Sequence, residues 1–363
     1  MTSGIALNAI CPYFTMFPLS FPTRVLSRAS VTSSVLDPFC GRGTTNMAAR
    51  LRGMPTTGID SNPVATAVTS AKLVSTTPEA VVDALISILN RPENHQDLPS
   101  SDFWSLMYHE ATLKTLVHVR NTLIQDCRSP ARVALRAIFL GALHGPVQKN
   151  IQSYLSNQAP RTYAPKPRYA VRFWTERELY PPIADIIEVV ARRARRYYRT
   201  PLPTPPFEVR CADSRDLEAF VDLRKTPVDW IITSPPYYGL NTYGPDQWLR
   251  LWFLGGPPTV DYTRQNQLTH SSPENYARQL SRVWENCRRI AQPKARMVIR
   301  FGGIPSRSAN PLEILRSSLK NTGWHIQTKS DAGVAPRGSR QGDQFGVKST
   351  ARTEFDLWTI KSD

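Results

Sequence analysis

Two short segments, far apart in the chain, carry residues whose types and spacing suggest chemistry. The first, residues 37–45, is Asp-Pro-Phe-Cys-Gly-Arg-Gly-Thr-Thr, and the second, residues 233–237, is Thr-Ser-Pro-Pro-Tyr. Each directly follows an apolar run of the kind expected for a buried strand, and the first continues into a helical pattern. Open parallel sheets bind ligands at the carboxyl ends of their strands. Both segments are therefore predicted to be site-forming turns.

The first segment predicts a ligand-binding glycine turn. Gly41 and Gly43 allow the backbone to turn sharply and to approach a ligand closely. Asp60 closes the next predicted strand, 19 residues after Gly41, where an acid can accept both hydroxyls of a ribose. A dinucleotide is the competing ligand, but its G-x-G-x-x-G pattern needs glycine where this chain has Asn46. S-adenosylmethionine has an ammonium and a sulfonium instead of phosphates, and these suit Asp37 and the carbonyls of the turn.

The second segment predicts a turn that accepts hydrogen bonds. Consecutive prolines, Pro235 and Pro236, fix φ and remove two donors, so nearby carbonyls face outward as acceptors. An exocyclic base amine is a poor nucleophile because its lone pair is delocalised into the ring. The Ser234 hydroxyl and the Pro235 carbonyl could hold its two hydrogens and direct the lone pair at a sulfonium methyl for in-line transfer. Tyr237 would stack on the base, which must first flip out of the duplex.

The two segments together resemble the D-P-F-x-G-x-G-T-T and S-P-P-Y motifs of the DNA amino-methyltransferases. The resemblance implies an α/β fold of the Rossmann-like class I methyltransferase type, with a seven-stranded, mostly parallel sheet and an antiparallel edge hairpin. It also implies S-adenosyl-L-methionine as cofactor, double-stranded DNA as partner, and a cognate restriction endonuclease as a candidate partner. Serine at the first position of S-P-P-Y is typical of N4-cytosine enzymes, whereas aspartate or asparagine is typical of N6-adenine enzymes. The oligomeric state is left open.

The expected function is therefore site-specific methylation of the N4 amino group of cytosine. An N6-adenine enzyme is the nearest alternative, and a non-catalytic DNA-binding protein that keeps the cofactor fold is an alternative of another class. No Pro-Cys dipeptide occurs, which argues against a cysteine nucleophile of the C5-cytosine type.

The resemblance also assigns site residues. Tyr13, Phe14 and Thr15 would cover the methionine end of the cofactor, although an apolar arm packed on the sheet is the alternative. Asp213 would contact adenine, or would merely belong to a strand-end turn. The catalytic set is Ser234, Pro235, Pro236 and Tyr237, with Asn241, Tyr243, Asp246 and Trp248 either lining the base pocket or starting the next helix. The cofactor set is Tyr13, Phe14, Thr15, Asp37, Pro38, Phe39, Gly41, Gly43, Thr44, Thr45, Asp60, Ser61, Asn62, Asp213, Ser214 and Thr233.

Alternating strands and helices are predicted to position these turns. Helical patterns at 44–52 and 62–73 lie between early strands, which favours right-handed crossovers and a parallel sheet covered on both faces. The last two strands are separated by a glycine-rich stretch, 330–353, and so are expected to pair antiparallel. The predicted strands are 34–39, 56–59, 207–211, 230–233, 296–301, 324–329 and 354–360.

The middle of the chain interrupts this alternation with helical patterns. Three parts are therefore expected: residues 1–74 as the cofactor-binding half, 75–205 as a helical insert that is a candidate for DNA recognition, and 206–363 as the catalytic half. The insert contains an apolar helix at Arg132–Leu143 and a loop at Ser153–Trp174 that interleaves basic and aromatic residues. An amphipathic helix is predicted to open at Pro181-Pro182, with an apolar face formed by Ile183, Ile186, Ile187, Val190, Ala194 and Tyr197.

The net charge favours a polyanionic partner. In 363 residues, 45 Lys and Arg against 29 Asp and Glu give a net charge of +16. The alternative for the net charge is a basic protein without such a partner. The alternative for the arginines at positions 192–199 is an ordinary solvated helix face. The candidate DNA contacts are Arg161, Lys166, Arg168, Arg192, Arg195, Arg196, Arg199, Arg337, Arg340 and Lys348.

Cysteine and histidine spacing predicts neither disulfides nor a metal site. The five cysteines are scattered and never form a CxxC pair, which favours a reducing compartment. The six histidines show no ligand-like spacing. No window reaches the length of a membrane span, no basic segment precedes the uncharged N-terminus, and Pro12, Pro18 and Pro22 interrupt it. The chain is predicted to be intracellular.

Overall fold

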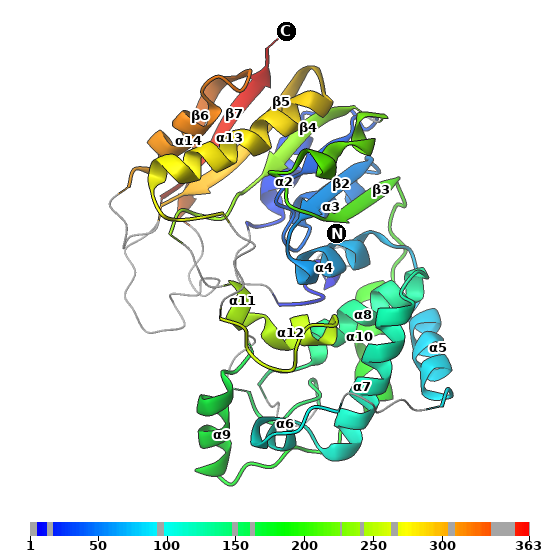
Figure 1. Cartoon of the computed structure of the whole chain (residues 1–363). Helices are drawn as coiled ribbons and strands as arrows, with labels where there is room; N and C mark the ends of the chain where they lie inside the picture. The colour runs from blue at the N-terminus through cyan, green and yellow to red at the C-terminus, as the bar shows by residue number, and fades with distance from the viewer. Residues whose placement is uncertain are drawn as a thin grey trace. The chain divides into compact units, whose positions relative to one another are not determined.

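The computed structural model describes residues 6–12, 17–92, 98–146, 152–159, 164–225, 227–239, 243–262, 268–303, 309–334 and 353–362. The chain divides into two compact units, whose elements are labelled in Figure 1. The sheet unit comprises Tyr13–Leu73, Pro203–Asn241 and Gln265–Asp363. The helical unit comprises Met1–Pro12, Val74–Leu202 and Thr242–Arg264.

The sheet unit is built on seven strands in the order β3-β2-β1-β4-β5-β7-β6 (Figure 1). Neighbours from β3 to β5 pair parallel, whereas β7 pairs antiparallel with both β5 and β6. The predicted fold class is thereby confirmed, including the antiparallel pairing of the last two strands. The strands are β1 (Val35–Asp37), β2 (Thr56–Asp60), β3 (Phe207–Cys211), β4 (Val228–Thr233), β5 (Ala291–Gly302), β6 (Trp324–Val334) and β7 (Thr353–Lys361).

Helices cover both faces of this sheet, and the central strands β1 and β4 accordingly bury apolar residues such as Leu36, Ile231 and Ile232. Because side chains alternate along a strand, Trp230 and Ile232 of β4 join one core while Ile231 joins the other. The helices and 3₁₀ turns are α2 (Ser20–Leu26), α3 (Thr44–Leu51), α4 (Pro63–Leu73), η1 (Leu217–Phe220), η2 (Asp222–Lys225), α13 (Pro273–Ile290) and α14 (Pro311–Leu319).

Helix α13 illustrates how the local sequence sets an element. Ser272 caps the helix, since its side chain accepts a hydrogen bond from the Asn275 amide at 3.1 Å, and Pro273 occupies the first turn. Its buried face, which includes Tyr276, Leu280 and Trp284, packs into the larger core. The helix thereby places Tyr276 beside the residues that follow β4, as described below.

The helical unit contains the predicted helix-rich insert and two further segments. Residues 6–12 and 243–262 also belong to the helical unit. The prediction had instead assigned residues 1–74 and 206–363 entirely to the two halves of one methyltransferase domain. The reason is non-local packing: the Trp252 ring lies 4.5 Å from that of Trp104, centroid to centroid. The helices are α5 (Pro78–Leu89), α6 (Asp102–Met107), α7 (Glu110–Gln125), α8 (Pro130–Ala142), α9 (Pro167–Thr175), α10 (Ile186–Tyr198), α11 (Tyr243–Asp246) and α12 (Trp248–Phe253).

Three local predictions were wrong. The loop predicted at Ser153–Trp174 contains most of α9, which begins at Pro167. Residues 330–334, predicted as the start of a glycine-rich loop, belong to β6, which extends to Val334, and residues 335–352 lie outside the described residues. Pro181-Pro182 do not open α10, which is capped instead by Asp185 through a 2.9 Å bond from the Glu188 amide.

The later start of α10 also changes its buried face. Ile183 lies before the helix and is 69% exposed, and Ile187 is 43% exposed. Val189 and Tyr198 are buried instead. Within the described ranges, no helix is both long and apolar enough to cross a bilayer.

Candidate functional site

The glycine turn follows β1 at the carboxyl end of the sheet. Gly41 and Gly43 have φ of 51° and 72°, the left-handed region that favours glycine. The Gly43 amide donates to the Cys40 carbonyl at 2.7 Å, which closes the turn, and α3 begins at the next residue. Thr45 in the first turn of α3 donates its hydroxyl to the Ile232 carbonyl of β4 at 3.0 Å. The turn is thereby tied to the strand that carries the second segment.

Gly43 is required for packing as well as for its backbone angle. A Cβ at this position would lie 2.6 Å from Oγ1 and 2.7 Å from Cγ2 of Thr69 on α4. Gly53 offers a matched comparison, because it has a similar φ of 70° but no atom within 4 Å of the added Cβ. Comparing alanine substitutions at Gly43 and Gly53 therefore separates the cost of backbone strain from the cost of steric overlap.

We expect Gly43→Ala to lower the free energy of unfolding by about 3 kcal/mol, from left-handed strain together with overpacking. Gly53→Ala should cost about 1 kcal/mol, because only the strain applies. Urea unfolding of both variants measures the difference. If both variants lose the same free energy of unfolding, Thr69 moves away from the added Cβ at no energetic cost.

Asp37, the last residue of β1, has one carboxylate oxygen engaged and one unpartnered. Oδ1 accepts the Thr233 hydroxyl at 2.7 Å and the Phe39 amide at 3.1 Å. Oδ2 is buried and receives no hydrogen bond from any described residue. Burial raises the pKa of Asp37 to about 7, against the opposing effect of the Thr233 and Phe39 hydrogen bonds. Such an oxygen suits a cationic ligand group, which would supply both a donor and a compensating charge.

The Thr233–Asp37 hydrogen bond joins the two segments directly. The strands that carry them, β1 and β4, are parallel neighbours, with Val35 opposite Trp230 and Leu36 opposite Ile231. Their carboxyl ends therefore lie at the same edge of the sheet, although the bonded residues are 196 positions apart. The sequence interpretation depended on this proximity, which the structure confirms.

Asp60, at the end of β2, is held by two backbone amides. Oδ2 accepts from Gly41 and Oδ1 accepts from Asn62, each at 2.9 Å. Burial, reinforced by the negative charge of Asp213, raises the pKa of Asp60 to about 6. Each oxygen keeps a second lone pair and can still accept a ribose hydroxyl. Asn62 in turn accepts from the Val64 amide at 2.9 Å at the start of α4, and Ser61 lies between Asp60 and Asn62 in the chain.

Asp213 and Ser214, after β3, have partners within the protein. Asp213 forms an ion pair with Arg215, whose Nε lies 3.0 Å from both carboxylate oxygens. Burial alone would raise the pKa of Asp213, but hydrogen bonds and charge from Arg215 hold it below its usual value. Ser214 donates its hydroxyl to the Pro38 carbonyl at 2.6 Å. The Ser214 hydroxyl therefore braces the glycine turn, and a cofactor contact by Asp213 would have to share its carboxylate with Arg215.

The second segment leaves β4 and turns beside α13. Tyr276 donates its hydroxyl to the Pro236 carbonyl. Among the described residues, no hydrogen bond to the Pro235 carbonyl is found. The Gly239 amide donates to His270 Nδ1 at 3.0 Å, which fixes the end of the turn. Tyr276 and His270 lie in no recognisable motif, and the sequence alone did not indicate them.

Tyr237 is held at both its ring and its hydroxyl. The hydroxyl donates to Glu354 Oε1 of β7 at 3.0 Å, and the ring packs edge-on against Phe301 with centroids 5.4 Å apart. Burial, with the nearby Glu354 carboxylate, raises the pKa of Tyr237 well above its usual value. The ring predicted to stack on a base is therefore rigidly placed. Glu354 is a further residue that sequence reasoning missed.

Several predicted site residues lie outside the described residues, namely Tyr13, Phe14, Thr15, Arg161, Asn241, Arg337, Arg340 and Lys348. Trp248 belongs to the core of the helical unit, where it donates to the Pro165 carbonyl at 3.2 Å and packs 5.1 Å from Phe103. Trp248 therefore fits the second of its two predicted roles, since it is the first residue of α12. Asp246 is the last residue of α11, and its carbonyl accepts from the Ala164 amide at 3.1 Å.

The candidate basic contacts of α10 and α9 differ in exposure. Arg195, Arg196 and Arg199 are exposed at the C-terminal end of α10, and Arg195 pairs with Glu188 at 3.5 Å. Arg192 is partly buried and donates to the Gln152 carbonyl, so it is less available than predicted. Lys166 and Arg168 are exposed at the start of α9, next to an aromatic pair, Tyr169 and Phe173, with ring centroids 6.3 Å apart.

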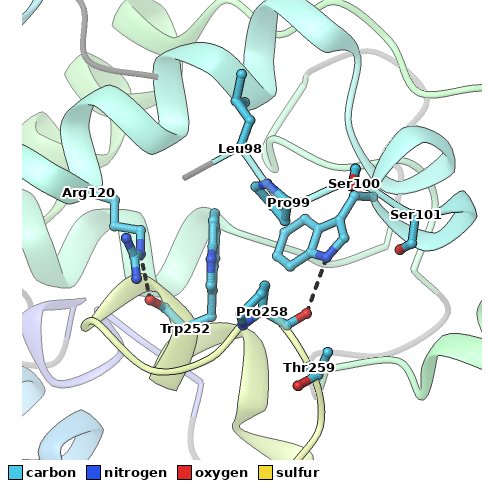
Figure 2. A pocket seen from close by; sticks show the side chains of 9 residues that line it. Leu98, Pro99, Ser100, Ser101, Arg120, Trp252, Pro258 and Thr259 are labelled. Atoms are coloured by element: carbon cyan, nitrogen blue, oxygen red, sulfur yellow. Dashed lines mark hydrogen bonds between the residues drawn. The ribbon is translucent and has the colours of Figure 1, made fainter. Parts of the chain in front are cut away.

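A cavity of about 580 Å³ lies within the helical unit (Figure 2). Trp104 and Trp252 form part of its wall, and the Trp104 indole donates to the Pro258 carbonyl at 3.2 Å. Arg120 donates from Nε to the Trp252 carbonyl at 2.8 Å. None of the predicted site residues lines this cavity.

No protein-family model and no curated protein sequence matches the chain. Solved structures resemble it at low identity. The rRNA methyltransferase aviRa from Streptomyces viridochromogenes is 12% identical, with 97% of this chain and 89% of that chain covered and a TM-score of 0.36. A SAM-dependent methyltransferase from Methanosarcina mazei is 9% identical, with 96% and 98% covered and a TM-score of 0.35. One from Agrobacterium tumefaciens is 11% identical, with 96% and 63% covered and a TM-score of 0.35. Similarity this slight carries no argument about function.

Proposed function

We propose that the chain is an S-adenosylmethionine-dependent methyltransferase that methylates the N4 amino group of cytosine in double-stranded DNA. One observation carries the proposal: the Thr233–Asp37 hydrogen bond joins the glycine turn to the Ser-Pro-Pro-Tyr turn. A methyl donor held by the first turn would therefore face an amine held by the second. The resemblance of both segments to the DNA amino-methyltransferases supports the substrate class.

The residues of the glycine turn fit the proposed cofactor. The buried Oδ2 of Asp37, which receives no hydrogen bond from the described residues, would accept from the ammonium of the methionine part. Asp60, oriented by Gly41 and Asn62, would accept the ribose hydroxyls. S-adenosylmethionine supplies an electrophilic methyl group on its sulfonium when bound.

The second turn would hold and orient the target amine. Because the Pro236 carbonyl already accepts from Tyr276, the Pro235 carbonyl is the backbone acceptor left for substrate, beside the Ser234 hydroxyl. These two acceptors would hold both amine hydrogens, so that the nitrogen becomes more tetrahedral and its lone pair faces the methyl group. The base must leave the duplex to reach them.

Methyl transfer to a defined duplex tests the proposal. Labelled S-adenosylmethionine is incubated with the protein and mixed-sequence duplex DNA, and the digested nucleosides are separated by mass spectrometry. We expect N4-methylcytosine. N6-methyladenine would instead establish the adenine alternative, which Ser234 disfavours. Cofactor and DNA binding without any methylated nucleoside would establish the non-catalytic alternative.

The exposed arginines of α10 give a separate prediction on DNA affinity. Replacing Arg195, Arg196 and Arg199 by alanine should weaken DNA binding and reduce the slope of log K against log salt by about 0.9 per lost phosphate contact. Fluorescence anisotropy over a salt series measures both quantities.

A matched control removes the same charge elsewhere. Arg278, Arg282 and Arg289 are also exposed on a single helix, α13 of the sheet unit. Their replacement by alanine should change the slope less. Equal changes in both variants would contradict a specific role for α10 and leave only the general effect of net charge.

A further inference from the structure

The fold separates the aromatic residues of α9 into a buried and an exposed set. The buried face of the helix consists of Ala170 and Trp174. The Trp174 ring lies 5.7 Å from that of Phe103 on α6, centroid to centroid, and its indole donates to the Gln158 carbonyl at 2.7 Å. Trp174 therefore belongs to the core of the helical unit and holds α9 beside α6 (Figure 1).

The exposed set consists of Tyr169 and Phe173. Tyr169 is 55% exposed, and its ring stacks with that of Phe173, with centroids 6.3 Å apart and planes at 23°. The Arg177 guanidinium, just after the helix, lies 4.4 Å from the centroid of the Phe173 ring. Because these residues are four positions apart, they follow one side of the helix and the turn after it. We call Tyr169, Phe173 and Arg177 the stacked row.

The stacked row is ordered by contacts within the protein. Phe173 contacts both of the other members, whereas Tyr169 forms the N-terminal end of the row. More than half of the Tyr169 side chain is exposed, so its ring has surface to offer to one further planar group. A ring that is already held in place loses little conformational entropy when a ligand stacks on it.

Positive charge surrounds the stacked row. Lys166 and Arg168 are exposed at the start of α9, on either side of Pro167 and directly before Tyr169. Arg172 is also exposed, and its partner Glu176 lies 3.5 Å away at the surface, where an ion pair is weak and exchanges readily for another anion. Over residues 166–178, four basic and two acidic side chains give a net charge of +2. The surface is therefore complementary to an anion that carries planar rings.

Single-stranded nucleic acid has both of these properties. Its phosphates are negative, and its unpaired bases present flat faces that stack on aromatic side chains. In a paired duplex those faces are covered by neighbouring bases, so a surface ring cannot reach them. An acidic peptide would meet the positive charge but offers no row of rings. The stacked row thus favours an opened strand over a closed duplex.

We propose that the stacked row of α9 binds single-stranded DNA, with an unpaired base stacked on Tyr169 and the flanking phosphates bound by Lys166 and Arg168. The inference rests on the proposed function only for the choice of DNA, because flipping of a target base opens the duplex and supplies an unpaired strand. Phe173 and Arg177 act as positioning residues that hold the Tyr169 ring in place.

Fluorescence anisotropy of the full chain, without cofactor, measures affinity for a labelled single-stranded DNA and for the duplex of the same sequence. Tyr169→Ala should weaken binding of the single strand by about 5- to 150-fold, the effect of losing one stacked base. Tyr169→Phe keeps the ring and should retain the wild-type affinity. Tyr169→Leu is apolar but not planar and should lose it. Affinity for the duplex should stay unchanged in all three variants.

A salt series separates stacking from charge. Tyr169→Ala should leave the slope of log K against log salt unchanged, because a stacked base releases no counterion. Replacing Lys166 and Arg168 by alanine should reduce the slope for the single strand by about 0.7 per lost phosphate contact.

Tyr262→Ala is the matched control, because Tyr262 is 65% exposed on another segment of the same unit. It should keep the wild-type affinity for the single strand. The inference is overturned if the wild type does not bind the single strand, if Tyr169→Ala binds it like the wild type, or if Tyr169→Ala loses as much affinity for the duplex. A loss confined to RNA of the same sequence overturns the choice of DNA.

Failure of the proposed function gives a different result. A wild type that methylates no DNA contradicts the proposed methyltransferase activity. Binding of the single strand through Tyr169 in that same protein still supports the stacked row, because the binding measurement needs neither cofactor nor methyl transfer.

Discussion

Replacing Ser234 by alanine should lower methyl transfer by about 10²–10³-fold, the usual loss when one oriented polar group is removed from a reacting centre. The substitution removes one of the two acceptors proposed for the amine. Affinity for S-adenosylmethionine should stay unchanged, because Asp37 and Asp60 are left intact. Initial rates with labelled cofactor and calorimetric titration of the cofactor measure the two effects.

Ser27→Ala is a suitable control for this experiment. Ser27 is an exposed serine of the same unit, at the end of α2, and its hydroxyl donates only locally, to the Arg24 carbonyl at 2.7 Å. The control should methylate at the wild-type rate. If Ser234→Ala does so as well, the role assigned to the Ser-Pro-Pro-Tyr turn is wrong.

Asp37→Asn should have two opposite effects, one on the cofactor and one on the fold. Cofactor affinity should fall by about 10²-fold, because a buried ion pair loses one partner. The cofactor-free protein should be more stable by about 1–3 kcal/mol near pH 8, because the buried charge is removed. Calorimetric titration and urea unfolding of the same variant measure both changes.

The pH dependence follows from the raised pKa of Asp37. Folding moves this pKa from 3.8 to about 7, so the folded protein binds the proton more tightly than the unfolded chain does. The associated stability is fully present below the unfolded pKa and is lost as pH rises through about 7. Wild-type stability without cofactor should therefore decline over this window more steeply than that of Asp37→Asn.

Cofactor affinity should change in the opposite sense, because the ionised carboxylate is the form that pairs with the ammonium. Affinity of the wild type should rise by about tenfold from pH 6 to pH 8, as the group ionises. Asp60, with a pKa of about 6, contributes in the same direction at lower pH. Asp222→Asn, an exposed acid of the sheet unit, should leave both pH profiles unchanged. A flat affinity profile in the wild type would contradict the role of Asp37.

Features determined by contiguous residues could be predicted from the sequence. The glycine turn is an example, because the left-handed φ of Gly41 and Gly43 and the start of α3 depend on neighbouring residues. The central strands were also predictable, since strands covered on both faces are rich in apolar residues. The start of α10 was predicted wrongly because two helix-start signals lie close together, the Pro181-Pro182 pair and the capping residue Asp185. The helix begins after Asp185, whose side chain caps it.

Features that join distant residues were decided by the tertiary structure. The sheet order places β4 beside β1 and so brings Thr233 to Asp37, which the spacing along the chain does not specify. Trp248 was predicted either to line the base pocket or to start the next helix, and packing in the aromatic core of the helical unit decided for the second alternative.

The sequence by itself determined the two turns, the fold class and the chemistry that the turns suggest, because short-range sterics and hydrogen bonding act within a few residues. Only the tertiary structure placed Tyr276 and Glu354 against the second turn, from a helix and a strand that follow it in the chain. A tyrosine or glutamate acquires such a role from the groups that surround it in the folded protein. Its surroundings depend on sheet register and packing, which are properties of the whole sheet unit.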